Sequence, residues 1–177
     1  MLDGTKILRE CWNYDEQAKK YRDTLVPVYD SEDSVCGIIY NDVPYYFQKN
    51  LQGDVIAIVN KDAETVARYS YDAWGVCTVV QDSTECGIAN INPFRYRSYY
   101  FDEETNLYYL QSRYYDATVG RFVNGDNPSL LDEQNSILSY DLFAYCENDS
   151  INYIDVIGER RKPKVKIKKI ATAVILT

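Results

Sequence analysis

Tyr69-Ser70-Tyr71-Asp72-Ala73-Trp74-Gly75 is a sequence unit from which the architecture of this 177-residue chain can be predicted. The two tyrosines are two residues apart, and side chains of a strand return to the same face every two residues. The Asp72 carboxylate can accept backbone N–H groups in a turn, and Gly75 can adopt the positive φ that lets the chain reverse. The unit therefore predicts a strand that ends in the tight turn of a β-hairpin.

An aromatic residue followed by Asp recurs along the chain. Tyr is the dominant aromatic residue, with 18 copies against five Phe and two Trp, and Tyr favours strands because its ring packs on a pleated sheet. The copies are Tyr14-Asp15, Tyr29-Asp30, Tyr71-Asp72, Phe101-Asp102, Tyr115-Asp116 and Tyr140-Asp141. Repeated strand–turn–strand units of this kind predict an antiparallel ribbon of β-hairpins.

The segments between these turns have the composition of strands. We expect strands at Lys6–Trp12, Val35–Tyr40, Pro44–Lys49, Val55–Asn60, Thr65–Tyr71, Val76–Gln81, Phe94–Tyr100, Leu107–Arg113 and Arg121–Asn124. Asp82–Asn92 is polar without periodicity and predicts a loop. Short helical turns are expected near the C-terminus, around Leu130–Gln134 and Leu142–Cys146. The predicted fold class is all-β.

Composition and charge exclude several functions. With 46% hydrophobic and 26% charged residues the chain has the composition of a folded soluble domain. Because it has no His, residues 1–177 cannot contain a Ser-His-Asp triad, a Cys-His dyad or a His-ligated metal site. Residues 159–177 hold seven Lys or Arg and one Glu, so residues 1–158 hold 12 basic and 26 acidic side chains, a net charge of −14. This acidic body predicts no nucleic-acid partner and leaves only the basic tail for contact with anionic surfaces.

The cysteines and the hydropathy pattern indicate neither a metal site nor a membrane anchor. Five cysteines are widely spread and contain no C-x-x-C pair, so we expect free thiols and no zinc or other cofactor. The chain has no run of 18 apolar residues and no basic-plus-apolar signal segment. We therefore expect no membrane span and no export signal within this chain.

Four longer stretches together point to a family. They are Tyr46-Phe47-Gln48-Lys49-Asn50-Leu51-Gln52-Gly53-Asp54, Ala67-Arg68 through Trp74-Gly75, Asn92-Pro93-Phe94-Arg95-Tyr96-Arg97, and Leu107-Tyr108-Tyr109-Leu110 through Arg113-Tyr114-Tyr115-Asp116 to Gly120-Arg121-Phe122. In this order and spacing they resemble the RHS repeat-associated core domain, found at the C-terminal end of bacterial YD-repeat proteins. Phe143-Ala144-Tyr145-Cys146 to Asn152-Tyr153-Ile154-Asp155 matches the closing segment of that core. The resemblance divides the chain into degenerate YD hairpins at residues 1–39, the core domain at residues 40–158, and a basic tail or truncated start of a variable domain at residues 159–177.

This resemblance implies a scaffold function. In the family, YD hairpins form a β shell that encloses a C-terminal toxin, and the core closes one end of the shell. Such polymorphic toxins act in interbacterial competition or on host cells and are secreted or held at the cell surface. The implied partners are therefore the rest of the shell and a toxin domain. Only 19 residues follow Gly158, too few for a toxin with a core of its own, so we expect the toxin to be absent from this chain.

The resemblance also implies self-cleavage at the end of the core by two aspartates in D-P-x-G motifs. Carried over to this sequence, these are Asp126 and Asp155, and the cleaved bond joins Gly158 to Glu159. Two neighbouring carboxylates can serve as acid and base without a His. The chain departs from the family pattern at Val156, which replaces Pro and frees the backbone, at Ser150 and at Glu159. The enzyme hypothesis is thus at most a degenerate aspartyl autoprotease, and the alternative is that both aspartates only cap turns.

The sequence supports three further interpretations. Aromatic faces of a β ribbon can stack on sugar rings, so a carbohydrate-binding β module is an alternative function. Four arginines lie among aromatic residues: Arg95, Arg97, Arg113 and Arg121. The acidic body favours their stacking on aromatic rings and pairing with Asp over binding RNA or phosphate. An uncovered strand edge at the N-terminal side also predicts self-association.

Overall fold

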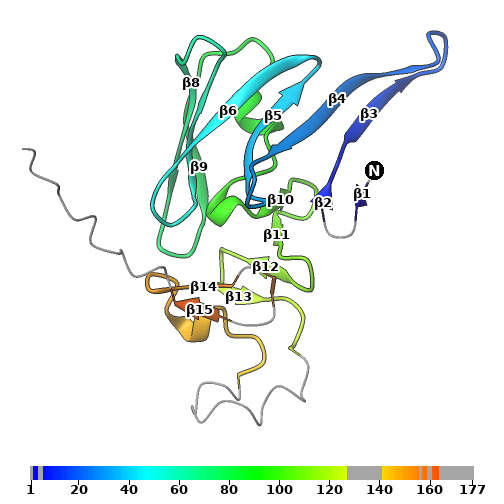
Figure 1. The fold of residues 1–177 in the computed structure, drawn as a ribbon. Helices are drawn as coiled ribbons and strands as arrows, with labels where there is room; N and C mark the ends of the chain where they lie inside the picture. The colour runs from blue at the N-terminus through cyan, green and yellow to red at the C-terminus, as the bar shows by residue number, and fades with distance from the viewer. Residues whose placement is uncertain (1, 4–5, 127–140, 156, 159–160, 164–177) are drawn as a thin grey trace, which may run out of the picture.

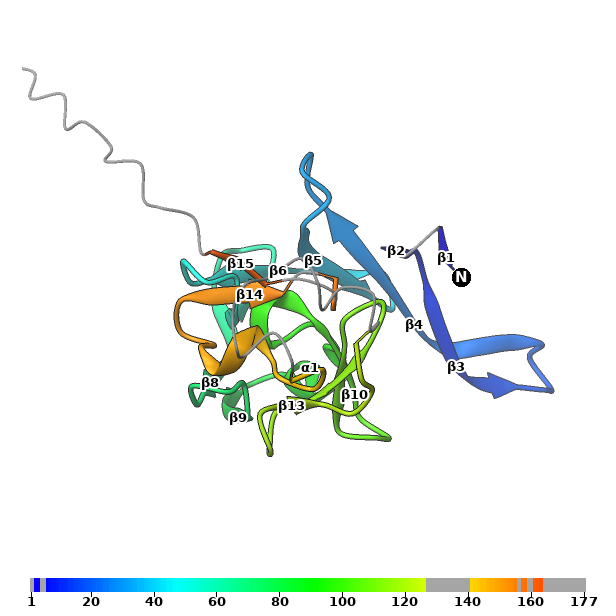
Figure 2. The same ribbon diagram turned by 90° about the horizontal axis from the view of Figure 1, so that it is seen from below.

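The computed structural model describes residues 2–3, 6–126, 141–155, 157–158 and 161–163, and it is built almost entirely from antiparallel sheets (Figure 1). The expected all-β fold is thereby confirmed. The largest sheet has seven strands that follow one another in chain order: β3 (Glu10–Asp15), β4 (Lys20–Tyr29), β5 (Val35–Tyr40), β6 (Val43–Lys49), β7 (Val55–Val59), β8 (Thr65–Tyr71) and β9 (Cys77–Asp82). The β3–β4 hairpin extends away from the rest of the molecule (Figure 2).

The remaining strands form smaller sheets. A four-stranded meander contains β10 (Tyr100–Asp102), β11 (Leu107–Tyr109), β12 (Tyr114–Asp116) and β13 (Arg121–Phe122). Two-stranded pairs are formed by β1 (Leu2–Asp3) with β2 (Lys6–Ile7), and by β14 (Tyr153–Asp155) with β15 (Arg161–Pro163). Along the chain, the one-turn helix α1 (Ile88–Ile91) and a 3₁₀ turn at Tyr96–Ser98 come between β9 and β10. A second 3₁₀ turn follows at Cys146–Asn148. No helix in these described segments is both long and apolar enough to span a bilayer.

Four of the six hairpin turns of the large sheet share one mechanism. Each of the four begins with an Asp or Asn whose side-chain oxygen accepts the backbone N–H groups two and four residues later. These residues are Asp30, Asn50, Asn60 and Asp72. At Asp72 the Oδ1 atom accepts three N–H groups, from Trp74, Gly75 and Val76, at 2.7–2.9 Å. The predicted role of the Tyr-Asp unit in chain reversal is thus confirmed, and Asn can take the place of Asp.

Several predicted boundaries were wrong, for local reasons. β4 was missed because its first half is polar and Pro27 lies inside it. The expected strand Lys6–Trp12 is divided between two different pairings, and the expected loop Asp82–Asn92 contains α1. The segment Phe94–Tyr100 makes only one bridge at Phe94 before a turn, since Arg97 and Ser98 have φ of 53° and 59°.

The other deviations lie towards the C-terminus. The expected strand Leu107–Arg113 ends at Tyr109, because Gln111 takes a φ of 64° and starts a turn. The helical turn expected at Leu142–Cys146 is displaced to Cys146–Asn148. Leu130–Gln134 lies outside the described residues.

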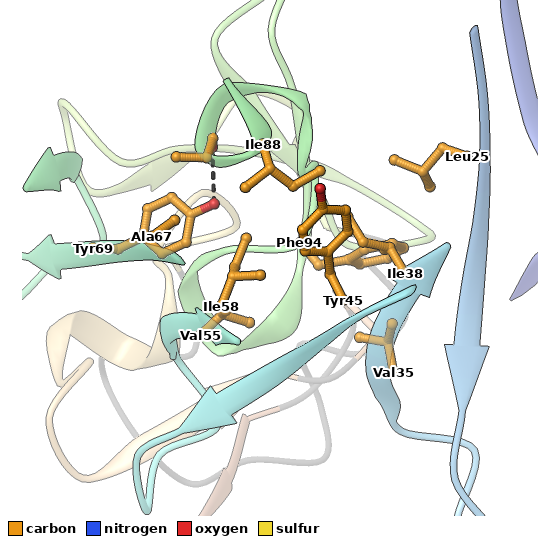
Figure 3. Packing of buried hydrophobic residues seen from close by; sticks show 11 residues of the cluster. Leu25, Val35, Ile38, Tyr45, Val55, Ile58, Ala67, Tyr69, Ile88 and Phe94 are labelled. Atoms are coloured by element: carbon orange, nitrogen blue, oxygen red, sulfur yellow. Dashed lines mark hydrogen bonds between the residues drawn. The ribbon is translucent and has the colours of Figure 1, made fainter. Parts of the chain in front are cut away.

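A mainly aliphatic core lies beneath the seven-stranded sheet (Figure 3). Its members come from alternate positions of successive strands, for example Ile38, Ile58 and Ala67, each with no exposed area. Ile88 and Phe94, from the segment that follows β9, cover the same face. The alternation of buried and exposed side chains along β5 to β8 therefore creates the core.

A second core, made mainly of tyrosines, joins the four-stranded sheet to the chain's closing segment. Its fully buried rings are Tyr96, Tyr108, Tyr115 and Tyr145. The hydroxyl groups of three of them bind consecutive carbonyl oxygens of the turn between β8 and β9: Tyr96 to Ala73 at 3.2 Å, Tyr115 to Trp74 at 2.7 Å and Tyr108 to Gly75 at 2.9 Å. The Tyr-Asp turn of the first sheet is in this way inserted into the core of the second.

Candidate functional site

Arg113 is the centre of a polar cluster at the end of the core. It lies in the turn between β11 and β12, and its guanidinium carbon is 3.6 Å from the centre of the Phe122 ring. One guanidinium nitrogen, Nη2, is 3.1 Å from Asp126 Oδ2 and 3.4 Å from Asp155 Oδ2. The other, Nη1, donates to the carbonyl oxygen of Leu142 at 3.1 Å. A single buried cation therefore links both predicted aspartates.

Asp155 is held from several sides. It is the last residue of β14, only 2% exposed, and its Oδ1 accepts the backbone N–H of Gly158 at 2.8 Å. The Tyr99 hydroxyl donates to the carbonyl oxygen of Asp155 and lies 3.0 Å from the hydroxyl of Tyr145. Burial raises the pKa of Tyr99 and of Tyr145 well above 10, so both hydroxyls stay protonated at neutral pH.

Gly158 is fixed just as closely. Its carbonyl oxygen accepts hydrogen bonds from Arg113 Nε and from Ser112 Oγ, the latter at 2.7 Å. Its φ is +74°, and a Cβ at this position would lie 2.7 Å from Ser112 Oγ and 2.8 Å from the carbonyl oxygen of Leu110. Only glycine fits this backbone position without a shift of its neighbours.

The structure brings together the residues predicted for self-cleavage. Asp126, Asp155 and Gly158 all contact Arg113, although they come from segments up to 45 residues apart from it. Glu159 and Val156 lie outside the described residues. Ser112 was missed by sequence analysis, and Arg113 was interpreted only as an aromatic-stacking and Asp-pairing residue. No local signal connects either residue to Gly158, because the contact arises from the fold.

Two carboxylates and a peptide carbonyl that share one guanidinium form a group that can move protons and stabilise charge. A carboxylate can accept a proton from water, and a cation beside the carbonyl oxygen stabilises negative charge that develops there. Across the described segments, no group of three or more Cys, Asp or Glu side chains is arranged to hold a metal ion.

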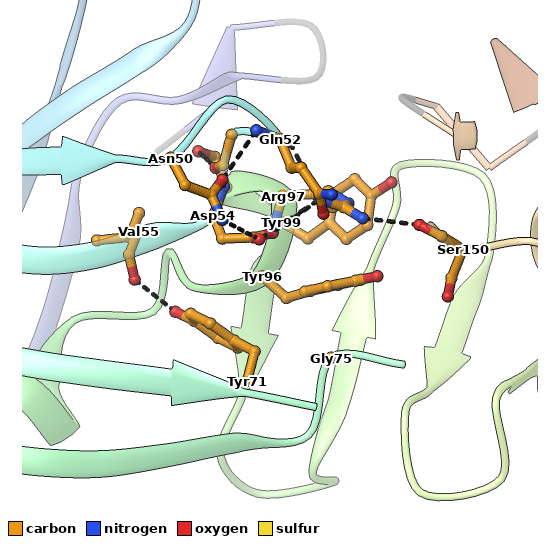
Figure 4. Close-up of polar contacts among 12 residues, drawn as sticks. Asn50, Gln52, Asp54, Val55, Tyr71, Gly75, Tyr96, Arg97, Tyr99 and Ser150 are labelled. Atoms are coloured by element: carbon orange, nitrogen blue, oxygen red, sulfur yellow. Dashed lines mark hydrogen bonds and ion pairs between the residues drawn. The ribbon is translucent and has the colours of Figure 1, made fainter. Parts of the chain in front are cut away.

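Arg97 forms a second buried ion pair, with Asp54 just before β7, and also a hydrogen bond to the closing segment (Figure 4). Its Nη1 lies 3.3 Å from Asp54 Oδ1, and its Nη2 donates to the carbonyl oxygen of Ser150 at 2.8 Å. The guanidinium also lies 4.6 Å from the centre of the Tyr96 ring. The prediction that this Arg stacks on an aromatic ring and pairs with Asp is confirmed. The pair anchors the segment that leads into β14.

A cavity of about 640 Å³ lies between the N-terminal strands and the four-stranded sheet. Tyr29, Phe94, Tyr99, Tyr100, Tyr109 and Tyr114 contribute to its lining. Tyr109 and Tyr114 are paired at 5.2 Å between ring centres and are more than one-third exposed. Lys6, Asp33 and Asp102 also reach the cavity.

Comparisons with known proteins point to one family. The family model described as Teneurin YD-shell matches residues 14–152. The chain is 39% identical over 114 residues to the tRNA nuclease WapA of Bacillus subtilis, covering 64% of this chain and 5% of that protein. It is 38% identical over 118 residues to the tRNA3(Ser)-specific nuclease WapA of Bacillus spizizenii, covering 67% of this chain and 5% of that protein. The chain thus spans about one-twentieth of the length of these curated relatives.

Solved structures show the same fold. The structure of the Photorhabdus luminescens Tc holotoxin pore matches with a TM-score of 0.66 at 16% identity, over 82% of this chain and 7% of that chain. The crystal structure of TcdB2-TccC3 matches with a TM-score of 0.63 at 18% identity, over 77% and 7% of the two chains.

Proposed function

The chain belongs to the teneurin YD-shell family, and on this basis we propose that it is the closing scaffold of a YD-repeat shell that encloses a toxin. The observation that carries the proposal is the way residues 141–155 complete the tyrosine core. Tyr145 has no exposed area, Ala144 forms a bridge to Arg121 of β13, and the Ser150 hydroxyl donates to Ala73 of the Tyr-Asp turn at 2.6 Å. A segment bound on this many sides is suited to end a ribbon of hairpins.

The proposed partners are the remainder of the shell and a toxin domain. Relatives named as tRNA nucleases and as part of a Tc toxin support a place among secreted or surface-held polymorphic toxins that act in interbacterial competition. Within this proposal, residues 1–39 are YD hairpins, residues 40–158 are the core and residues 159–177 begin a variable region or form a basic tail. The proposed assembly involves neither nucleic acid nor a cofactor in this chain.

A domain exchange tests the closing role. In a chimera, this chain replaces the matching segment of Bacillus subtilis WapA. The chimera is compared with the parent WapA and with a WapA deletion variant that lacks the segment. We expect the chimera to form a closed particle in negative-stain electron microscopy and to resist protease as the parent does. A chimera digested as fast as the deletion would contradict the proposal.

Self-cleavage after Gly158 is the second candidate, favoured by the contact of Arg113 with Asp126, Asp155 and the Gly158 carbonyl oxygen. In this reaction a carboxylate of the Asp126 and Asp155 pair accepts a proton from water as the water oxygen bonds to the Gly158 carbonyl carbon. The C–N bond to Glu159 then breaks, and the leaving amine takes a proton from the protonated carboxyl group. The intact mass is measured after incubation at neutral pH beside Asp155→Asn. Loss of the segment after Gly158 in the parent chain alone supports the candidate; both proteins remaining at 20.5 kDa argues against it.

The cavity with its paired Tyr109 and Tyr114 favours a third candidate, a carbohydrate-binding module. A glycan array with the parent chain and a Tyr109→Ala variant tests it. Binding that the variant loses supports this function, and no binder among the sugars removes it.

The edge of β3 is the proposed site of self-association, since β3 ends the order of the seven-stranded sheet. Asn13 has a φ of 54° and interrupts the pairing register with β4, which shortens the regular edge. Sedimentation analysis over a range of concentrations measures whether a second copy pairs there.

A further inference from the structure

Ser112 makes three polar contacts with the backbone at Ile157 and Gly158. Its Oγ lies 2.7 Å from the carbonyl oxygen of Gly158 and 2.7 Å from that of Ile157. Its backbone N–H donates to the Ile157 carbonyl at 3.3 Å. A hydroxyl has a single proton to donate, so the Ser112 proton is shared between the two carbonyl oxygens.

The Gly158 carbonyl oxygen receives donors from two consecutive residues. Arg113 Nε is the second, and the N–H of Gly158 is fixed by Asp155 Oδ1 at 2.8 Å. Both polar groups of Gly158 are therefore directed by side chains. The steric limit on position 158 also comes in part from Ser112, whose Oγ would lie 2.7 Å from an added Cβ.

We propose that the Ser112 hydroxyl is the second hydrogen-bond donor, beside Arg113, that orients the Gly158 carbonyl oxygen and stabilises it during cleavage. This inference rests on the proposed self-cleavage. When water adds to the carbonyl carbon, negative charge develops on the oxygen that Ser112 and Arg113 already contact. Donors that are in place before the reaction stabilise this charge without reorganisation. The carboxylates of Asp126 and Asp155 are left to transfer protons.

The alternative is that Ser112 only anchors the chain end, and Ser98 supplies a matched control for it. The Ser98 hydroxyl donates to the carbonyl oxygen of Gly53 at 2.8 Å, in a hydrogen bond that is partly buried like the one from Ser112 to Gly158. It therefore makes the same kind of serine-to-glycine hydrogen bond at a different place. An effect that depends only on the loss of such a bond would appear equally in Ser98→Ala and Ser112→Ala.

Gly158-Glu159 is the only Gly-Glu pair in the sequence. One labelled sample can therefore report both the hydrogen bonding of the Gly158 carbonyl and the rate of cleavage. The full chain is labelled with ¹³C at glycine carbonyls and ¹⁵N at glutamate, so that a single carbonyl–nitrogen correlation comes from this peptide bond. The position of the signal reports the hydrogen bonding of the carbonyl, and its decay reports cleavage. The variants are Ser112→Ala, Ser112→Thr and Ser98→Ala.

We expect Ser112→Ala to move the carbonyl resonance to higher field and to slow the decay about a hundred- to a thousandfold, the range of a lost donor to a developing oxyanion. Ser112→Thr, which keeps the hydroxyl, should restore most of the rate, and Ser98→Ala should change neither quantity. A parent rate retained by Ser112→Ala, or an unmoved carbonyl resonance, overturns the inference. If the parent signal does not decay while the resonance still moves, the self-cleavage proposal fails, and Ser112 is an anchor rather than a donor for the reaction.

Discussion

In the seven-stranded sheet, Ile38 and Ile58 are buried without any polar group, whereas the second core buries Tyr96, Tyr108 and Tyr115, each with a hydroxyl to satisfy. The first sheet gains its stability mainly from the removal of aliphatic surface from water, a non-directional effect, although the Tyr69 hydroxyl of this core also donates to the carbonyl oxygen of Ala89 at 2.8 Å. The second gains it from rings whose hydroxyls reach defined carbonyl oxygens, and an unmet hydroxyl in that place would cost free energy. The comparison indicates that the second core specifies a single docking position for the Tyr-Asp turn, whereas the first core depends mainly on the alternation of apolar residues.

Alkaline pH should produce the largest difference between the two regions. Burial raises the pKa of Tyr96, Tyr99, Tyr108, Tyr115 and Tyr145 above 10, the value expected in the unfolded chain. A raised folded pKa means that the protonated hydroxyls stabilise the fold fully below pH 10, and that this stability is lost as the pH rises from 10 through the folded values. Each such tyrosine contributes a slope of about 1.4 kcal/mol per pH unit.

We therefore expect cooperative loss of the tyrosine core above pH 10. Ultraviolet absorbance of tyrosinate and hydrogen exchange measure this loss. The aliphatic strand β7, which contains no tyrosine, should retain exchange protection longer than β11 and β12. If these tyrosines ionised near pH 10, as tyrosine does in an unfolded chain, while the fold stayed intact, this explanation would be contradicted.

Replacement of Arg113 should have the largest effect of a single mutation. Arg113→Met keeps the side-chain length but leaves Asp155, which is 2% exposed, without its cation. Breaking a buried pair from one side costs about 3–5 kcal/mol. Chemical denaturation measures the loss, and Arg68→Met is the control because Arg68 is exposed on β8. Equal stability of the two variants would show that Arg113 does not stabilise the attachment of the closing segment.

Gly75→Ala tests the Tyr-Asp turn where the two regions meet. Gly75 has a φ of +102°, and an added Cβ would lie 2.5 Å from the Tyr96 ring. The strained backbone and the displaced ring together should cost about 2–4 kcal/mol. Gly87→Ala is the control, since Gly87 also has a positive φ of +72° but has no atom within 4 Å of the added Cβ. The difference between the two variants, measured by thermal denaturation, isolates the contact with Tyr96.

The regular part of this fold could be predicted from the sequence because its causes are local. Period-two alternation located β5 to β8, and the Asp72 unit located its turn. The second region could not be predicted to the same extent, because Arg97, Ser98 and Gln111 take positive φ although none of them is glycine. Asp126 and Asp155 were found through a family resemblance, whereas the link between them through Arg113 depends on contacts that only the folded chain makes.

Tyr115→Phe is the mildest test of the comparison, because it removes one oxygen and keeps the ring. The Trp74 carbonyl oxygen loses the donor that lies 2.7 Å away, and no water replaces it easily in a core where Tyr115 has no exposed area. We expect a loss of about 1–2 kcal/mol in the free energy of unfolding. Tyr46→Phe is the control, since Tyr46 is 45% exposed on β6 and should tolerate the change. If Tyr115→Phe were as stable as this control, the hydroxyl bonds would be incidental and the two cores would differ only in the shape of their side chains.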